Sequence, residues 1–199
     1  MTTPPKKSKK SNYAKFILQL LIKRTHKIEI KSIPENSVID IGGGGEGIIA
    51  QIGRDRITVV DKLQSEIDEA QHKAPEAKWI LADARNLKFS DGQFDSATAF
   101  FSIMYMSNED KREVFKEVYR VISQKGEFWI WDASIAKEEG VFLIKIKVIF
   151  PDKTAVRTAY GVPSKKQNAE LTKEMLQAIG FKVKLTEIHK HWYLLKAKK

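Results

Sequence analysis

Short apolar runs alternate with segments of helical periodicity through the middle of the chain. The runs have the length and β-branched content of strands, and the segments between them repeat apolar residues every three or four positions. Strands that alternate with helices indicate βαβ units and a mainly parallel sheet with right-handed crossovers. The expected strands are residues 38–41, 57–61, 78–82, 94–100 and 127–131, and the expected helices are residues 48–52, 63–70 and a helix that Ser107 caps and Gly126 ends.

The pattern changes after residue 140. Two β-type segments, residues 141–150 and 154–162, flank Pro151-Asp152-Lys153 and predict an inserted β-hairpin within residues 141–167. A helix follows, capped by Asn168 and ended by Gly180. The last two strand-like segments, 181–189 and 192–197, are joined by so short a link that they must be antiparallel.

The N-terminal part has a different composition. Residues 1–12 are rich in lysine and contain proline, which predicts a disordered basic tail. From residue 13 apolar residues recur at helical spacing among basic ones, and we expect an N-terminal capping helix over residues 13–30 of a single domain that spans residues 13–199. Such a helix either packs on its own domain or lies on an anionic membrane.

The composition fits one cytoplasmic domain. With 199 residues and 42% hydrophobic content, the chain can build a continuous core. It has no cysteine, which excludes a disulfide framework, a thiolate zinc site and a cysteine nucleophile. Neither a membrane-spanning run nor the apolar core of a secretion signal is visible.

The net charge of +10 is unevenly distributed. Residues 1–28 carry eight Lys/Arg and no acid, residues 29–140 carry 14 basic and 21 acidic residues, and residues 141–199 carry 13 basic and four acidic ones. Basic ends of this kind could serve an anionic substrate, a nucleic acid or a membrane surface, or form a solvated exterior.

A glycine turn follows the first strand of the alternating region. The stretch Asp40-Ile-Gly42-Gly43-Gly44-Gly45-Glu46-Gly47 opens a helix, and its glycines let backbone N–H groups approach a nucleotide-like ligand. Gly42-x-Gly44-x-x-Gly47 also matches the dinucleotide fingerprint, with Asp61 placed to hold a ribose, so an NAD(P)-dependent oxidoreductase is one interpretation. Asp40 favours another ligand, because a carboxylate there suits a ligand that carries an amine.

The stretch resembles the first motif of class I S-adenosylmethionine-dependent methyltransferases, an acid followed by glycines at alternate positions. The third alternate glycine of that motif falls at position 46, which is glutamate here, so the loop departs from the family at that point. The resemblance covers roughly residues 36–135 and 168–199. It implies an α/β, Rossmann-like class I methyltransferase sheet, mainly parallel with a C-terminal antiparallel strand, plus the inserted hairpin, and S-adenosylmethionine as the cofactor.

The resemblance also implies roles for individual residues. Asp40 would act on the methionine end of the cofactor, directly or through water, Asp61 would hold both ribose hydroxyls, and Asp83 would contact the adenine amine. The carboxyl ends of parallel strands line one crevice, so these three acids should converge on one ligand. The implied cofactor-binding residues are Asp40, Gly42, Gly43, Gly44, Asp61, Lys62, Asp83, Ala84, Phe100, Phe101 and Ser102.

The acceptor is expected to be a small molecule. Methyl transfer is an in-line displacement that needs a positioned nucleophile more than a dedicated base, so no catalytic residue is assigned. The Asn/Asp-Pro-Pro-aromatic run of amino-directed nucleic-acid enzymes is replaced by residues 100–103, and the lack of cysteine excludes thiolate chemistry. No metal is expected, since the four histidines lack ligand spacing. The substrate candidates are Tyr105, Trp131, Asp132 and Tyr160.

The basic segments suggest an anionic acceptor. In relatives the N-terminal helix and the 141–167 insertion cover the active site, and both are basic here. The cations that would face the acceptor are Lys23, Arg24, Lys145, Lys147 and Arg157. A solvated strand edge explains the lysines equally well. A non-catalytic, methyltransferase-like RNA-binding protein is a further interpretation, and the hairpin could serve as a lid or as a homodimer contact.

Overall fold

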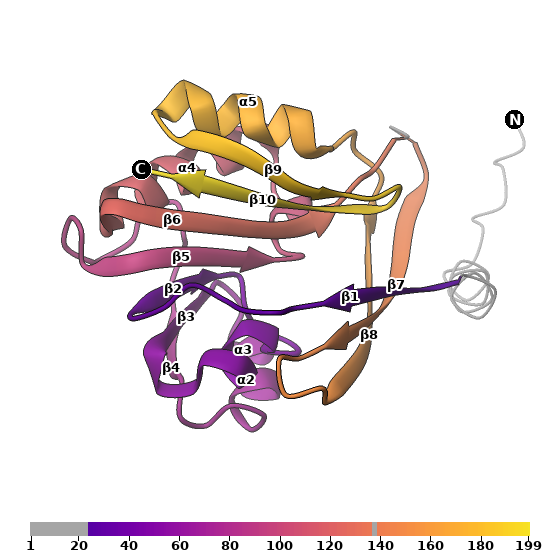
Figure 1. Cartoon of the computed structure of the whole chain (residues 1–199), viewed down its shortest axis with the longest axis horizontal. Coiled ribbons are helices and arrows are strands. Elements are labelled where there is room, and N and C mark those ends of the chain that lie inside the picture. The colour runs from indigo at the N-terminus through magenta and orange to yellow at the C-terminus, as the bar shows by residue number, and fades with distance from the viewer. Residues whose placement is uncertain (1–23, 137–138) are drawn as a thin grey trace, which may run out of the picture.

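The computed structural model describes residues 24–136 and 139–199, and its centre is a seven-stranded sheet of order β4-β3-β2-β5-β6-β10-β9 (Figure 1). Neighbouring strands from β4 to β6 are parallel, and β10 is antiparallel to both β6 and β9. This confirms the expected mainly parallel sheet with a C-terminal antiparallel strand. The strands are β2 (Val38–Ile41), β3 (Ile57–Asp61), β4 (Lys78–Leu81), β5 (Phe94–Phe100), β6 (Ile122–Ala133), β9 (Lys182–Ile188) and β10 (Trp192–Lys198).

Helices connect the strands where the apolar periodicity predicts them. Ser107 and Asn168 cap their helices as expected, because each side chain accepts a hydrogen bond from the backbone N–H three residues later. Gly180 ends the last helix with a φ of +121°. The helices are α2 (Ile48–Gly53), α3 (Gln64–Gln71), α4 (Asn108–Val121) and α5 (Ala169–Ile179), with 3₁₀ turns η1 (Arg54–Arg56) and η2 (Ile103–Tyr105).

The predicted end of α4 is wrong. The helix ends at Val121 and the chain enters β6 at once, because Ile122 pairs with Phe94 of β5. Gly126 lies within β6, where a Cβ would stand 2.6 Å from the carbonyl oxygen of Asp95. The glycine therefore allows two strands to approach closely and does not terminate the helix.

A second sheet, which we call the covering sheet, consists of β1 (Thr25–Glu29), β7 (Val141–Ile149) and β8 (Ala155–Pro163). The antiparallel pairing of β7 with β8 confirms the predicted hairpin, and β1 adds to it in parallel. The expected helix over residues 13–30 is wrong at residues 25–29, because the backbone there forms a ladder with β7. Residues 13–23 of that helix and the expected tail lie outside the described residues.

Two apolar clusters form the core. One contains α4 and α5 residues and one face of the central sheet, including Phe115, Phe128 and Leu176. The other joins the opposite face to the covering sheet through residues such as Ile49 and Ile146. The covering sheet is thus held to the central sheet by buried apolar contact. Among the described residues no helix has the length and apolar character needed to cross a membrane.

Candidate active site

A cleft of about 660 Å³ opens at the carboxyl ends of the parallel strands and is bounded on one side by β8. Figure 1 shows β7 and β8 standing across the ends of β5 and β6. A crevice at this edge is where open parallel sheets bind ligands. The predicted site residues that line it are Gly42, Gly44, Asp61, Lys62, Asp83, Ala84, Phe100, Phe101, Ser102, Tyr105 and Tyr160.

The glycine turn, residues 42–47, forms the floor of the cleft through close approaches that a side chain would prevent. Gly42 has a φ of +67°, and a Cβ on it would stand 2.8 Å from the Cβ of Ser102. The N–H of Gly44 donates a hydrogen bond of 3.1 Å to Oδ2 of Asp61, and a Cβ there would stand 2.8 Å from the same oxygen. The turn is therefore drawn against the end of β3 and the start of η2.

Asp40 lies behind the glycine turn and does not line the cleft. Its side chain has no exposed surface, Oδ1 accepts a 2.7 Å hydrogen bond from Oγ1 of Thr98, and Oδ2 is buried without a hydrogen-bond partner among the described residues. A Cβ on Gly43, which is also absent from the lining, would stand only 2.0 Å from that oxygen. Burial raises the pKa of Asp40 to about 7. Asp61 and Asp83 thus meet at the cleft, whereas the expected convergence of all three acids does not include Asp40.

Carboxylates gather on the glycine-turn side of the cleft. Oδ1 of Asp61 accepts from the N–H of Leu63 at 3.0 Å, which holds the carboxylate at the strand end. Burial, and then the charges of Asp61 and Glu69, raise the pKa of Glu66. Glu46 lines the same wall and is paired with Lys73 at 3.0 Å.

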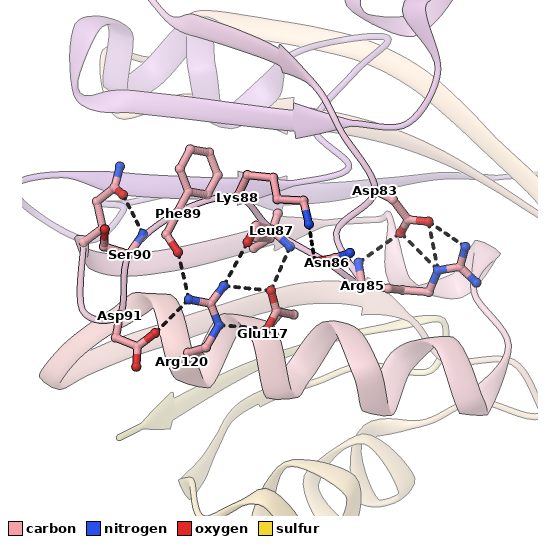
Figure 2. A network of polar contacts seen from close by, with 11 residues as sticks. Asp83, Arg85, Asn86, Leu87, Lys88, Phe89, Ser90, Asp91, Glu117 and Arg120 are labelled. Carbon is pink, nitrogen blue, oxygen red and sulfur yellow. Dashed lines mark hydrogen bonds and ion pairs between the residues drawn. The ribbon is translucent and has the colours of Figure 1, made fainter.

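Asp83 is held by an ion pair at the end of β4. Its carboxylate accepts from the backbone N–H and the guanidinium of Arg85, and these bonds lower the pKa of Asp83 (Figure 2). The same guanidinium donates to Asp110 in the first turn of α4 at 2.7 Å. Arg85 therefore joins the end of β4 to the start of α4 along one wall of the cleft.

The segment that follows Arg85 is fastened to α4. Glu117 accepts from the N–H of Leu87 at 2.7 Å, and Arg120 donates to the carbonyl oxygens of Leu87 and Phe89 (Figure 2). Arg120 also binds Asp91 and Glu117. These bonds satisfy backbone groups of a connection that has no regular structure, so the loop after Asp83 has a defined path.

Aromatic side chains form the wall opposite the acids. Tyr160 of β8 stacks on Phe101 with ring centroids 5.1 Å apart and planes 10° from parallel. Phe101 has a φ of +50°, a left-handed conformation rare for an aromatic residue. Tyr105 of η2 is 50% exposed and lines the cleft beside Met106. Burial raises the pKa of both tyrosines.

Trp131 and Asp132 lie in the core and not in the cleft. Trp131 packs between Phe100 and Trp129. Oδ2 of Asp132 accepts from the N–H of Ile103 at 2.9 Å, and Oδ1 accepts from the N–H of Ala133 and from Gln167. Neither of these two predicted substrate residues lines the cleft, and both side chains of β6 are buried in packed interior.

Asp132 instead belongs to a buried polar chain. Nζ of Lys111 donates to Oε1 of Gln167, whose amide donates to Asp132 at 2.8 Å. Burial raises the pKa of Asp132 to about 6. The chain links α4, the segment after β8 and the start of η2, and so supports the turn that carries Tyr105.

The cations expected at the acceptor are elsewhere. Lys145, Lys147 and Arg157 do not line the cleft, and neither does Arg24. Side chains alternate across a strand, so the lining residues Thr158 and Tyr160 place Arg157 on the opposite face of the covering sheet. Lys23 lies outside the described residues. The described cations expected at the acceptor therefore do not face the cleft.

Several lining residues were not predicted. They include Glu46, Glu66, Glu69, Arg85, Met106, Asp110, Thr158 and Ala159. Arg85 follows Asp83 by two residues, and Glu66 lies in the first turn of α3, so closeness to a strand end was the available indication. The described residues contain no group of three His, Asp or Glu side chains that could hold a metal ion.

Comparison with known proteins places this geometry in context. Residues 38–126 match a family model described as a methyltransferase domain. The chain is 32% identical over 117 residues to the sterol 4-C-methyltransferase strm-1 of Caenorhabditis elegans. This aligned region covers 54% of this chain and 34% of that protein. It is also 30% identical over 108 residues to the demethylmenaquinone methyltransferase of Thermotoga maritima, and this aligned region covers 52% of this chain and 46% of that protein. The chain spans less than half the length of these two curated relatives.

Solved structures share the fold. An S-adenosylmethionine-dependent methyltransferase from Mesorhizobium loti superposes with a TM-score of 0.61 at 15% identity, covering 84% of this chain and 94% of that one. The structure of a DhpI–SAH complex gives a TM-score of 0.61 at 14% identity, covering 94% and 84%. At these identities the likeness concerns the fold.

Proposed function

We propose that this chain, which belongs to the class I S-adenosylmethionine-dependent methyltransferase family, transfers a methyl group from S-adenosylmethionine to an uncharged, largely apolar acceptor. The family assignment argues against the NAD(P)-dependent interpretation of the glycine turn. The acceptor is the part of the proposal that depends on the cleft itself.

The observation that carries the cofactor assignment is the unpartnered Oδ2 of Asp40 behind the glycine turn. A buried carboxylate oxygen without a donor is costly, and a cationic ligand at the turn would offset that cost. Gly42 and Gly44 leave room for close approach, and Asp61 and Asp83 offer acceptors for hydroxyl and amine groups. The residues present therefore fit the cofactor.

When bound, S-adenosylmethionine would supply an electrophilic methyl group on a positively charged sulfur, with S-adenosylhomocysteine as the leaving group. The contribution of the protein is to hold and orient. Phe101, Tyr105, Met106 and Tyr160 would enclose the acceptor, exclude water and restrict its approach to one direction.

The charges of the cleft support an uncharged acceptor. Its two cationic lining residues, Lys62 and Arg85, lie at the ends of β3 and β4 beside acids. Glu46 and Glu66 contribute to the raised pKa values of the tyrosines, so their negative charge reaches the aromatic wall and would repel an anion. The sterol and menaquinone-precursor methyltransferases among the relatives are named for largely apolar acceptors.

Calorimetric titration tests the cofactor. The full chain is titrated with S-adenosylmethionine, S-adenosylhomocysteine and NAD(H), beside Asp61→Ala and the control Asp68→Ala, which removes an exposed carboxylate on α3. We expect the first two ligands to bind, and Asp61→Ala to weaken them about 100-fold through the loss of two charged hydrogen bonds. Binding of NAD(H) alone would overturn the proposal.

Transfer of labelled methyl tests the acceptor. A sterol, a demethylated quinol and matched acceptors that carry a carboxylate or phosphate are compared at equal concentration. We expect transfer to the uncharged compounds. Transfer to the anionic compounds only would contradict the uncharged class while leaving the cofactor assignment intact.

A further inference from the structure

A row of three cations crosses the covering sheet. Lys27 of β1 stands directly beside Lys147 of β7, which stands directly beside Arg157 of β8. Neighbouring strands are about 4.8 Å apart, so the row is about 10 Å wide. Lys145 lies two positions from Lys147 and adds a fourth cation on the same face.

This face points away from the cleft. Thr158 and Tyr160 of the inner face line the cleft, and Ile146 is buried in the core that joins the two sheets. The intervening positions of the same strands therefore face outward. Arg157 and Lys27 are exposed, and Lys147 is partly exposed.

Within the described residues, Glu29 is the one carboxylate that pairs with the row. Lys145, Lys147 and Arg157 form no ion pair there, and Lys27 approaches Glu29 only at 3.7 Å. Glu29 is engaged more closely by Lys153, at 2.8 Å. Like charges directly opposite one another destabilise a sheet, so the row lowers the folding stability of the covering sheet. An anionic surface outside the molecule would offset that cost.

We infer that the outer face of the covering sheet docks on the surface of an anionic lipid bilayer. Clustered Lys and Arg side chains each add attraction to such a surface. The outward positions beside the row include Val141 and Ala155, which are exposed and apolar. An interface of cations and small apolar side chains suits lipid headgroups.

A nucleic acid fits the same face less well. Proteins that bind single strands combine cations with aromatic side chains on which bases stack. The outward positions of β1, β7 and β8 hold no aromatic residue. The chain before β1 supplies six further lysines and no acid within residues 1–23.

The inference rests on the proposed function in one respect, since a bilayer is where an apolar acceptor would be found. The inner face of the covering sheet lines the cleft, and the outer face carries the row, so a single layer of strands separates the two. Docking would bring the cleft to within about one sheet thickness, about 10 Å, of the headgroups. The acceptor would then reach the aromatic wall without crossing much water.

Vesicle sedimentation tests the inference with the full chain and without cofactor or acceptor. Vesicles of phosphatidylcholine with about 30% phosphatidylserine are compared with pure phosphatidylcholine, at low and high salt. The variant is Lys147→Glu with Arg157→Glu. The matched control is Lys182→Glu with Lys184→Glu, which makes the same charge change on exposed positions of β9. Urea unfolding of both variants verifies that they are folded.

We expect salt-sensitive binding to the anionic vesicles, at least about 25-fold weaker for the covering-sheet variant and within about threefold of wild type for the control. An equal loss of vesicle binding in both variants would show an effect of net charge and overturn the inference. Vesicle binding that is unchanged in both variants would overturn it as well. Displacement from the vesicles by single-stranded RNA at lower concentration than by free anionic lipid would assign the face to nucleic acid. Binding of S-adenosylhomocysteine is measured on the same samples, so a failure here is distinct from a failure of the proposed function.

Discussion

Asp40→Asn should stabilise the protein at neutral pH while it weakens the cofactor site. The wild-type carboxylate has a pKa of about 7 in the fold against an ordinary value of 3.8. The native state therefore holds this proton more tightly than the unfolded state, and the resulting stability is fully present below the unfolded pKa and is lost as pH rises to about 7. At 1.36 kcal/mol per unit, the charged form costs about 4 kcal/mol above that pH.

The asparagine removes this titration and has its own cost. It keeps the acceptor for Thr98, but its amide replaces the unpartnered Oδ2 and leaves donors unsatisfied, at about 1–3 kcal/mol. The variant should be more stable than wild type by about 1–3 kcal/mol at about pH 8 and should lose that advantage at about pH 5. Asp132, whose pKa is about 6, titrates in both proteins and cancels in the difference.

Urea unfolding at several pH values measures the difference. The difference between variant and wild type should change by about 3 kcal/mol between about pH 5 and pH 8. S-adenosylmethionine should bind more tightly to wild type as pH rises through about 7, because a cation favours the ionised carboxylate, and the variant should show no such dependence. If the difference in unfolding free energy between the variant and wild type were the same at both pH values, the conclusion that the Asp40 carboxylate is buried and unpaired would be refuted.

Three further substitutions probe other parts of the site. Gly43→Ala places a methyl group 2.0 Å from the buried carboxylate oxygen of Asp40. It should lower the unfolding free energy, measured in urea, by about 1–3 kcal/mol and weaken the binding of S-adenosylhomocysteine, measured by calorimetry, at least about tenfold. Unchanged affinity would contradict the packing of the turn. Arg120→Ala should lower the unfolding free energy by about 1–3 kcal/mol and speed amide exchange at residues 87–91, because Arg120 binds the carbonyl oxygens of Leu87 and Phe89. Exchange that stays slow would show that other contacts hold the loop. Asp132→Ala should lower the unfolding free energy, measured in urea, by about 3–5 kcal/mol, because it leaves Lys111 buried without the carboxylate to which Gln167 links it. A decrease below about 1 kcal/mol would argue against the buried polar chain.

Strands β3 and β5 could be predicted because most of their side chains are buried on both faces. Residues 57–60 are all β-branched, residues 94–100 combine small and aromatic side chains, and each strand has the predicted bounds in the structure. Residues 25–29 could not be predicted as a strand. They hold a single apolar residue, Ile28, and so carry no strand pattern, and the hydrogen bonds that form the strand come from β7.

The site was predictable where topology alone positions a side chain. Asp61 and Asp83 follow adjacent parallel strands, so their shared edge of the sheet could be inferred. Asp132 also ends a strand, but Gln167 and the N–H of Ile103 fill its hydrogen bonds, and both depend on tertiary packing. For Lys145 and Lys147, spacing shows that they share a face, and only the placement of Tyr160 shows which face is turned from the cleft.

The make-up of the covering sheet sets an order of events during folding. Thr25 pairs with Lys145, 120 residues further along the chain, whereas β2, β3 and β5 pair within a much shorter span. Closing so long a loop is entropically slow, so β1 has no partner until β7 has been synthesised. Strands β2 to β6 and the β7–β8 hairpin pair over shorter spans and can form first, and β1 then joins the covering sheet last. Protection of the β1 amides against exchange during refolding should therefore lag behind protection of the central sheet.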